Sequence, residues 1–259
     1  VTWLGCDLVS GRIIAELPEI TGTVSRVLGA YTSSRLTMPI PLAGPGALGD
    51  VAFQATEPGR TMVVAVVNDV PTWAGIVLQR IGGTDATLQL GCVSLEGYLD
   101  RRYVLEHTWT QQDEAAVIAA GLASDAQLDG IGLVIDAPAT GTLRDRTYEN
   151  TDDATVYRRL RELMGVIDGP EWTIDVDWED DDDRTVITKT LRVRKRIGVA
   201  AAEPATVFET TAPSVFASRG ASEATYTYAE DYSDGKGANH VVAYSSGEGD
   251  DRPQSVPQV

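Results

Sequence analysis

Few residues of this chain could serve as a nucleophile, a general base or a metal ligand. Its only histidines are His107 and His240, and its only cysteines are Cys6 and Cys92. A catalytic triad needs a nucleophile, a base and an orienting group, and neither histidine lies in a motif that supplies them. The cysteines lack the paired spacing of a zinc site and lie in strand-like sequence, which favours small buried side chains. We therefore predict no catalytic residue, no cofactor and no metal site.

Carboxylates are abundant, but their spacing is not that of a known ion site. The 38 acids against 21 bases give a net charge of -17. The run from Asp180 to Asp183 lacks the alternating ligands and the glycine of a calcium loop, so we expect a solvated hairpin turn there. Pairs of acids can hydrolyse glycosides, yet an acidic chain contains such pairs by chance. The charge argues against wrapping nucleic acid, but it is compatible with an acidic channel wall that DNA passes without binding.

The first hundred residues are expected to form mostly short strands. Ser10 and Gly11 mark a hairpin turn between two apolar runs. The buried run 60–67 is followed by a turn at 68–71 and, later, by an alternating strand at 86–95. Leu88, Leu90 and Cys92 should share one face of that last strand. Strands this short and closely spaced indicate a barrel or a sandwich.

The middle of the chain changes to helical spacing. Thr110 is expected to cap one helix, since an acid follows three residues later and strong helix formers come after it. A second helix is predicted across 150–165, with Asn150 or Thr151 as its cap and Gly165 as its end. Its arginines should lie on its outer face or near its end.

The last third returns to alternating strands. Apolar residues alternate with acids across 171–178 and with arginines across 190–197. If these two strands pair, acids face bases across the outer surface, which predicts a salt-paired surface in preference to a nucleic-acid patch. Further strands are expected at 205–210, 224–231 and 239–246.

These elements predict a mainly β protein with an α insert, of the α+β class. We expect two small β-barrel-like domains joined by a helical segment. The expected ranges are 1–105 for the first β domain, 106–168 for a helical or mixed insert, 169–246 for the second β domain and 247–259 for a polar tail or linker. The sequence contains no run of eighteen apolar residues, so no membrane span is predicted. The first residues lack a signal-peptide pattern. Folding in the cytoplasm is the expectation.

Tyrosine and arginine gather where the first β region ends and in the second predicted helix. The segment "GYLDRR" brings together Tyr98, Arg101 and Arg102, and the helix carries Arg158 and Arg159. A solvated strand end is the simpler interpretation. Tyrosine and arginine are also favoured anchors between subunits, so we predict these five residues as a subunit interface.

The order of several segments resembles a known family. "CDLVSGRIIAELP", "WAGIV", "LEGYLDRRYV", "HTWT", "DEAAVIA", "VYRRLRELM" and "PEWTIDVDW" follow one another as in minor tail proteins of long-tailed phages and prophages of actinobacteria. These proteins belong to the tail hub group, with the head region of tail-associated lysins and the hubs of contractile injection machines. The resemblance runs from about Cys6 to Trp178 and continues more loosely after that.

The resemblance implies a structural role in the virion, at the tail tip, after assembly in the host cytoplasm. Hub proteins carry two similar β-barrel domains, and three subunits form a ring that joins a six-fold tail tube to a three-fold tip. The implied partners are two further copies, the distal tail protein ring, the tape measure protein and a central tip or fibre protein. DNA would only pass through the channel, and no stable membrane insertion is implied. Many relatives are longer, and whether a lysin or receptor-binding segment follows here stays open.

Two other functions remain as alternatives. A tail-carried cell-wall or polysaccharide hydrolase would need a cleft with a carboxylate pair. A host receptor-binding module would need an exposed aromatic groove, to which tryptophans could contribute. Trp172 and Trp178 alternate with core residues, so burial is the expectation for them. The tryptophans of the chain are Trp3, Trp73, Trp109, Trp172 and Trp178.

Overall fold

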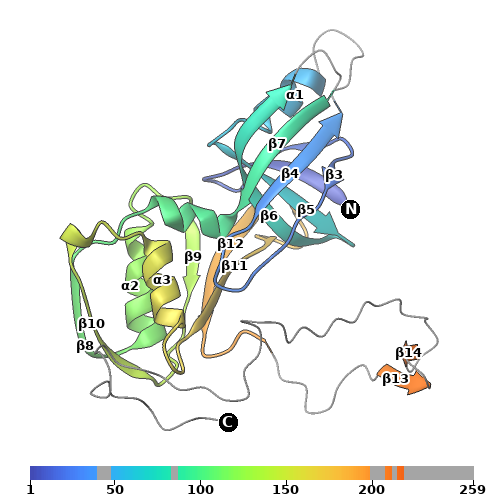
Figure 1. The fold of residues 1–259 in the computed structure, drawn as a ribbon. Helices are drawn as coiled ribbons and strands as arrows, with labels where there is room; N and C mark the ends of the chain where they lie inside the picture. Colours follow the sequence, from blue (N-terminus) through green and yellow to red (C-terminus); the bar gives the residue numbers. More distant parts are fainter. Residues whose placement is uncertain (40–47, 83–86, 199–207, 212–214, 219–259) are drawn as a thin grey trace, which may run out of the picture. The chain divides into compact units, whose positions relative to one another are not determined.

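The computed structural model describes residues 1–39, 48–82, 87–198, 208–211 and 215–218 (Figure 1). The chain divides into two units, Val1–Val199 and Ala200–Val259. The larger unit holds the main sheets and all the helices of the described residues.

A seven-stranded antiparallel sheet forms the first part of the larger unit. Its strands run in the order β2-β1-β5-β6-β7-β4-β3. The hairpin turns predicted around Gly11 and at 68–71 are confirmed. Gly11, Asn68 and Asp69 have φ of 73°, 49° and 64°, the left-handed conformation that tight hairpin turns require. The strands are β1 (Thr2–Asp7), β2 (Ile13–Leu17), β3 (Thr21–Gly22), β4 (Ser33–Pro39), β5 (Thr61–Val67), β6 (Val70–Gly82) and β7 (Thr87–Ser94).

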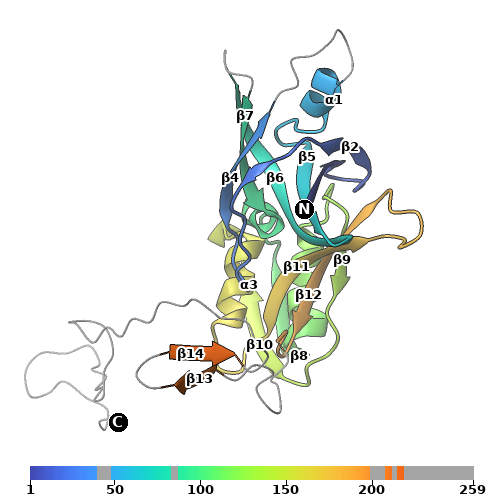
Figure 2. The same cartoon turned by 90° about the vertical axis from the view of Figure 1, so that its right-hand side faces the viewer.

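This sheet curls without closing into a barrel within the described residues (Figure 2). Register shifts in β1, β5 and β6 bend the strands. The two edge strands, β2 and β3, each pair with one neighbour and not with each other. Because β3 spans only two residues, it offers no edge long enough to pair with β2. The predicted first barrel is therefore corrected to an open, curled sheet.

Each face of the sheet has its own apolar core, because side chains alternate along a strand. One core holds the confirmed set Leu88, Leu90 and Cys92, and residues of the short helix α1 (Leu48–Gln54) and the turn after it join it. The opposite face carries residues such as Cys6 and Met62, and its core continues into the helices and the last strands. The second core thus ties the first β region to the rest of the unit.

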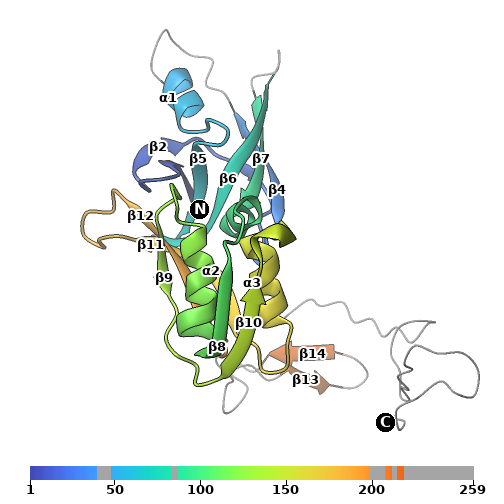
Figure 3. The same cartoon turned by 90° about the vertical axis from the view of Figure 1, so that its left-hand side faces the viewer.

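The middle segment combines helices with a two-stranded ribbon. Figures 1 and 3 show α2 and α3 side by side, with the β8–β10 ribbon next to them. The elements are the 3-10 helix η1 (Leu95–Arg101), β8 (His107–Asp113), the π-helix η2 (Glu114–Ala119), α2 (Ala120–Asp125), β9 (Leu133–Asp136), β10 (Leu143–Tyr148), the 3-10 helix η3 (Asn150–Asp152) and α3 (Val156–Met164).

The first of these helices begins later than predicted. Thr110 lies inside strand β8, so it does not cap a helix. Asp113 is the cap, because its carboxylate accepts hydrogen bonds from the backbone N–H groups of Ala115 and Ala116, each at 2.9 Å. Polar residues before the cap could pair with β10, which extended the strand at the expense of the helix.

The last strands of the larger unit form a three-stranded sheet. Strands β11 (Glu171–Trp178) and β12 (Ile187–Arg194) pair antiparallel, and β9 adds to β12 in parallel. The predicted pairing of acids with bases is confirmed, since Asp175 lies 2.5 Å from Arg192 and Glu171 lies 3.7 Å from Arg196. The parallel pairing joins the expected insert to the expected second β domain. The residue boundaries of the predicted domains stay predictions.

The smaller unit contributes one described hairpin. Strands β13 (Phe208–Thr211) and β14 (Val215–Ser218) pair antiparallel, and β13 overlaps the strand predicted at 205–210. The strands predicted at 224–231 and 239–246 lie outside the described residues, as do His240 and the polar tail at 247–259. The prediction of a mainly β protein with an α insert is confirmed. Among the described residues, no helix is both long and apolar enough to cross a membrane.

Candidate subunit interface

Helix α3 presents one apolar side and one charged side. Its apolar side enters the larger core through Val156, Leu160 and Leu163, at helical spacing. Gly165 ends the helix as predicted. This packing fixes α3 and leaves its opposite side exposed.

Thr155 caps α3, so the predicted caps Asn150 and Thr151 are wrong. The Thr155 hydroxyl oxygen accepts a hydrogen bond from the backbone N–H of Arg158 at 3.2 Å. The earlier residues form a separate 3-10 turn, η3. Asp153, with φ of 45°, lies between η3 and α3 and breaks the helical conformation there. The left-handed conformation cannot continue a right-handed helix.

Two tyrosines from different elements pack together beside this helix. Tyr31 comes from the loop between β3 and β4, and Tyr157 comes from the first turn of α3. Their ring centroids lie 4.9 Å apart at an interplanar angle of 48°. Tyr157 also contacts the buried ring of Trp172 edge-on, at 6.0 Å. Such aromatic pairs contribute about 0.5–1.5 kcal/mol beyond burial, so the exposed tyrosine is anchored to the core.

Asp100 connects the loop, η1 and α3 through one carboxylate. One oxygen accepts a hydrogen bond from the Thr155 hydroxyl at 3.0 Å, and the other accepts one from the Tyr31 hydroxyl at 3.4 Å. The negative charge of Asp100, with some burial and with Tyr157 nearby, raises the pKa of Tyr31 above its ordinary value. Tyr31 therefore stays a neutral hydrogen-bond donor at this surface.

Three exposed arginines surround the tyrosine pair. Arg161 lies over the Tyr157 ring at 5.7 Å, and the Arg158 Nε atom lies 3.1 Å from a carboxylate oxygen of Glu162. Arg101 is close enough to Tyr31 to lower the pKa of that tyrosine, against the stronger effect of Asp100. Within the part of the chain that the structure describes, neither Arg101 nor Arg161 forms an ion pair.

We name this surface the tyrosine–arginine patch. It contains a shallow pocket of about 410 Å³ between η1 and α3. Three arginines stand against two acids here, on a chain whose net charge is -17. Exposed tyrosine and arginine held on rigid elements are typical of protein interfaces. The members of the patch are Tyr31, Asp100, Arg101, Tyr157, Arg158, Arg161 and Glu162.

The structure places two of the five predicted interface residues in this patch and three in internal contacts. Arg101 and Arg158 belong to the patch. Tyr98 is buried, and its hydroxyl donates a hydrogen bond to the backbone oxygen of Ala126 at 2.7 Å. Burial raises the pKa of Tyr98 above its ordinary value, while nearby Arg102 opposes the rise.

The other two arginines hold their own chain together. The Arg102 guanidinium lies 5.6 Å from the Tyr98 ring centre and donates to the backbone oxygen of Leu128. Arg159 has a side chain that is only 13% exposed and pairs with Asp152 and with Glu162. Arg159 also lies before the last turn of α3, so the prediction that it is on the outer face of the helix or near its end is wrong. Whether these residues also meet another subunit stays a prediction.

Five patch residues were not among the predicted site residues, namely Tyr31, Asp100, Tyr157, Arg161 and Glu162. The i, i+4 spacing of Tyr157 and Arg161 places both on one side of a helix, so this pair could have been found. Tyr31 carried no such signal, because the segment 21–42 reads as strand-like. In the structure this segment holds β3, a loop and β4, and only tertiary packing brings Tyr31 to α3.

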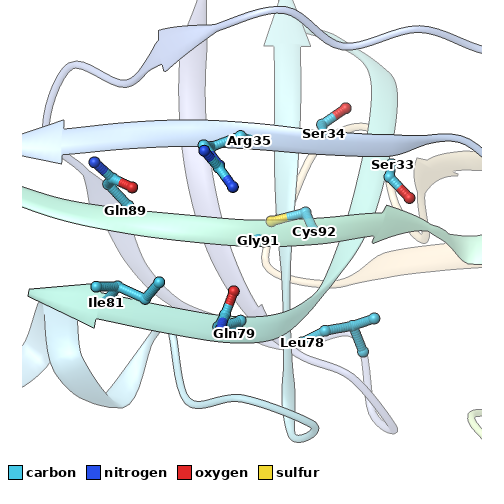
Figure 4. A pocket seen from close by; sticks show the side chains of 9 residues that line it. All are labelled: Ser33, Ser34, Arg35, Leu78, Gln79, Ile81, Gln89, Gly91 and Cys92. Atoms are coloured by element: carbon cyan, nitrogen blue, oxygen red, sulfur yellow. The ribbon is translucent and has the colours of Figure 1, made fainter.

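A second depression lies on the exposed side of β4, β7 and β6 (Figure 4). Gly91 sits at its centre, flanked across the strands by Arg35 and Gln79. Its volume is about 400 Å³, and Ile81 lies at its rim with 48% exposure. The side chains around it include no acid. Cys92, Ser33 and Ser34 lie in its lining, but no histidine, acid or aromatic residue accompanies them.

Comparisons with known proteins find similar solved structures but no matching sequence family. No family model matches the chain, and no curated protein matches it. The chain is similar to the crystal structure of the tail protein from Neisseria meningitidis MC58, at 14% sequence identity and a TM-score of 0.38. The similarity covers 74% of this chain and 50% of that one, so the chain spans half the length of that protein.

His107 and the two described cysteines make contacts that are structural in kind. His107 Nε2 lies 2.8 Å from a carboxylate oxygen of Asp125, and its ring stacks on Trp109. Cys6 and Cys92 are buried and free, and burial raises the pKa of each thiol to about 12. Among the described residues, no group of three or more histidine, cysteine or acidic side chains is arranged to hold a metal ion.

The tryptophans mostly lie inside the structure. Trp3, Trp73 and Trp172 are buried. Trp109 and Trp178 are partly buried against the larger core, and the Trp178 indole N–H donates to the backbone oxygen of Asp69 at 2.8 Å. The burial predicted for Trp172 is confirmed, and that for Trp178 holds in part. The exposed aromatic residues of the candidate interface are tyrosines instead.

Proposed function

We propose that this chain is a structural protein of a phage tail and, more specifically, a trimeric hub at the tail tip. The observation that carries the proposal is the tyrosine–arginine patch. An acidic chain presents three exposed arginines around an anchored tyrosine pair, which is the composition of a protein contact. The order of the segments that resemble tail hub proteins supports the kind of assembly.

In this proposal three copies form a ring that surrounds the DNA exit channel. The ring joins a six-fold tail tube to a three-fold tip. Its neighbours are the distal tail protein ring, the tape measure protein and a central tip or fibre protein. The subunits assemble in the host cytoplasm and remain at the tail tip of the virion. The charge of -17 suits passage of DNA without binding, because like charges repel across a Debye length of about 8 Å.

The proposal assigns the chain a role in assembly and no catalytic step. His107 contacts a carboxylate and an aromatic ring, and the two thiols are buried. A tail-carried hydrolase makes a different prediction, because the purified chain would clear cell-wall or capsule polysaccharide in a zymogram. A hub protein leaves the polysaccharide intact.

Gold-labelled antibodies against this chain test its place in the virion directly. Particles of the phage that encodes it should carry gold at the tail tip in electron micrographs. Label along the tube or on the head would contradict the proposed position. Particles without label, after denaturation that exposes internal epitopes, would contradict a structural role altogether.

A further inference from the structure

The turn between β11 and β12 carries five consecutive acids, Glu179 to Asp183. All five are exposed. Within the described residues none of their carboxylates forms an ion pair. The next residue, Arg184, lies 3.7 Å from the Asp69 carboxylate, and its Nε atom donates a hydrogen bond to the backbone oxygen of Asp181 at 2.8 Å. Like charges this close repel one another, so a cationic surface that approached the turn would be attracted to it.

The acidic turn has a defined shape. One carboxylate oxygen of Asp180 accepts hydrogen bonds from the backbone N–H groups of Asp182 at 2.8 Å and Asp183 at 3.3 Å. The backbone N–H of Arg184 donates to the Asp180 carbonyl oxygen at 3.0 Å. A turn held by its own hydrogen bonds loses less conformational entropy on binding than a flexible segment.

The acidic turn and helix α3, which carries much of the tyrosine–arginine patch, lie on different sides of the larger unit (Figures 2 and 3). Two complementary surfaces on different sides of one subunit make a head-to-tail contact possible. Such contacts close into a ring when the rotation between successive copies allows it. A face-to-face contact of two identical patches would instead place arginine against arginine.

We infer that the tyrosine–arginine patch of one copy binds the acidic β11–β12 turn of the next copy. This inference rests on the proposed trimer and names the contact that builds it. Arg101 and Arg161, which form no ion pair within the described residues, are the cations for the carboxylates of Asp181 and Asp182. Arginine suits this role because its planar guanidinium can bind a carboxylate through two parallel hydrogen bonds. Tyr31 and Tyr157 supply the anchored apolar part of the contact.

A charge-swap experiment tests the contact. The variants are R101E/R161E in the patch, D181K/D182K in the turn, and a chain with all four changes. The mass of each is measured by light scattering over a series of protein concentrations, and circular dichroism checks its fold. Each double variant should associate on the order of a hundredfold more weakly than the unchanged chain. The variant with all four substitutions should form the trimer again, because the two surfaces again carry opposite charges.

R35E/R60E is the matched control, since it makes the same change of charge at two exposed arginines outside the patch. It should remain trimeric. If the patch and turn variants remain trimeric as well, the inference is overturned while the trimer itself stands. If only R35E/R60E dissociates, the contact lies on the first β region, and the inference is again overturned. A monomer of the unchanged chain at every concentration overturns the trimer and the inference with it.

A disulfide between copies gives an independent test. R161C and D182C are prepared as separate proteins, mixed and oxidised. The inference predicts a cross-linked pair in the mixture and almost none in either protein alone. Cys6 and Cys92 should not interfere, because both are buried. Equal cross-linking in the mixture and in each protein alone would contradict a head-to-tail contact.

Discussion

The ring of Tyr157 packs against the ring of Tyr31 with their centroids 4.9 Å apart, which ties the β3–β4 loop to helix α3. Y157A should remove this contact, the edge-on contact with Trp172 and the support for Arg161. We expect the free energy of unfolding to fall by about 1–3 kcal/mol, measured by urea denaturation. Y157F should be nearly neutral, because the Tyr157 hydroxyl forms no hydrogen bond within the described residues. Equal losses for the two variants would contradict the assigned role of the ring.

Glu114 forms a buried ion pair that should matter more than the surface pairs. Its carboxylate is fully buried and lies 2.5 Å from Arg144 Nε. E114A leaves that guanidinium without its charged partner, so we expect a loss of about 3–5 kcal/mol in the free energy of unfolding. E57A breaks the exposed pair with Arg60 and should cost less than about 1 kcal/mol. Similar losses for both variants in urea denaturation would contradict this ranking.

Tyr98 and Tyr148 provide a matched pair of buried hydroxyls at neutral pH. The Tyr98 hydroxyl donates to the backbone oxygen of Ala126, whereas the Tyr148 hydroxyl has no hydrogen-bond partner among the described residues. Y98F should lower the free energy of unfolding by about 1 kcal/mol because it leaves a buried carbonyl oxygen without its donor. Y148F should be neutral or stabilising. A larger loss for Y148F in urea denaturation would contradict the assigned contacts.

The same tyrosines predict a loss of stability at alkaline pH. Burial raises the pKa of Tyr98 and of Tyr148 above the ordinary value of 10.0. The unfolded chain therefore releases these protons first. The stabilising contribution is fully present below pH 10 and is lost as the pH rises through the folded pKa. Urea denaturation from pH 8 upward should show a smaller alkaline loss for Y148F than for the unchanged chain, and identical slopes would contradict the burial of this group.

The thiols should be unreactive in the folded chain. Burial raises the pKa of Cys6 and of Cys92 to about 12, so few thiolates exist at pH 8, and thiolates are the reactive form. A thiol reagent should modify neither residue in the native protein and both in urea, as counted by mass spectrometry. Rapid modification of one cysteine without denaturant would show that its strand is accessible.

The sequence was sufficient where local pattern decides the structure. Alternation along 171–178 and 190–197 predicted that acids would face bases if these strands paired. The structure shows that pairing, and the ion pair of Asp175 with Arg192 is one result of it. Turn residues such as Gly11 predicted the hairpins. The apolar spacing of α3 predicted its buried side. Its cap is Thr155, because Asp153 adopts a left-handed conformation that residue spacing does not reveal.

Contacts between segments that are far apart in the chain could not be predicted from the sequence. The parallel pairing of β9 with β12 depends on how the helices pack against the core, and so does the position of Tyr31 on α3. Residue type alone also failed to separate exposed arginines from internal ones. Arg158 and Arg159 are neighbours, yet only Arg158 is exposed, because Arg159 lies over the Tyr148 ring at 4.8 Å and pairs with Asp152.

The central claim is that copies of this chain form a ring of three. Its most direct test is the mass of the purified chain by light scattering, with the same sample imaged in negative stain. The proposal predicts three times the mass of 27.7 kDa and ring-shaped particles with a central hole. A single-chain mass at every concentration, with compact particles that have no hole, would contradict it.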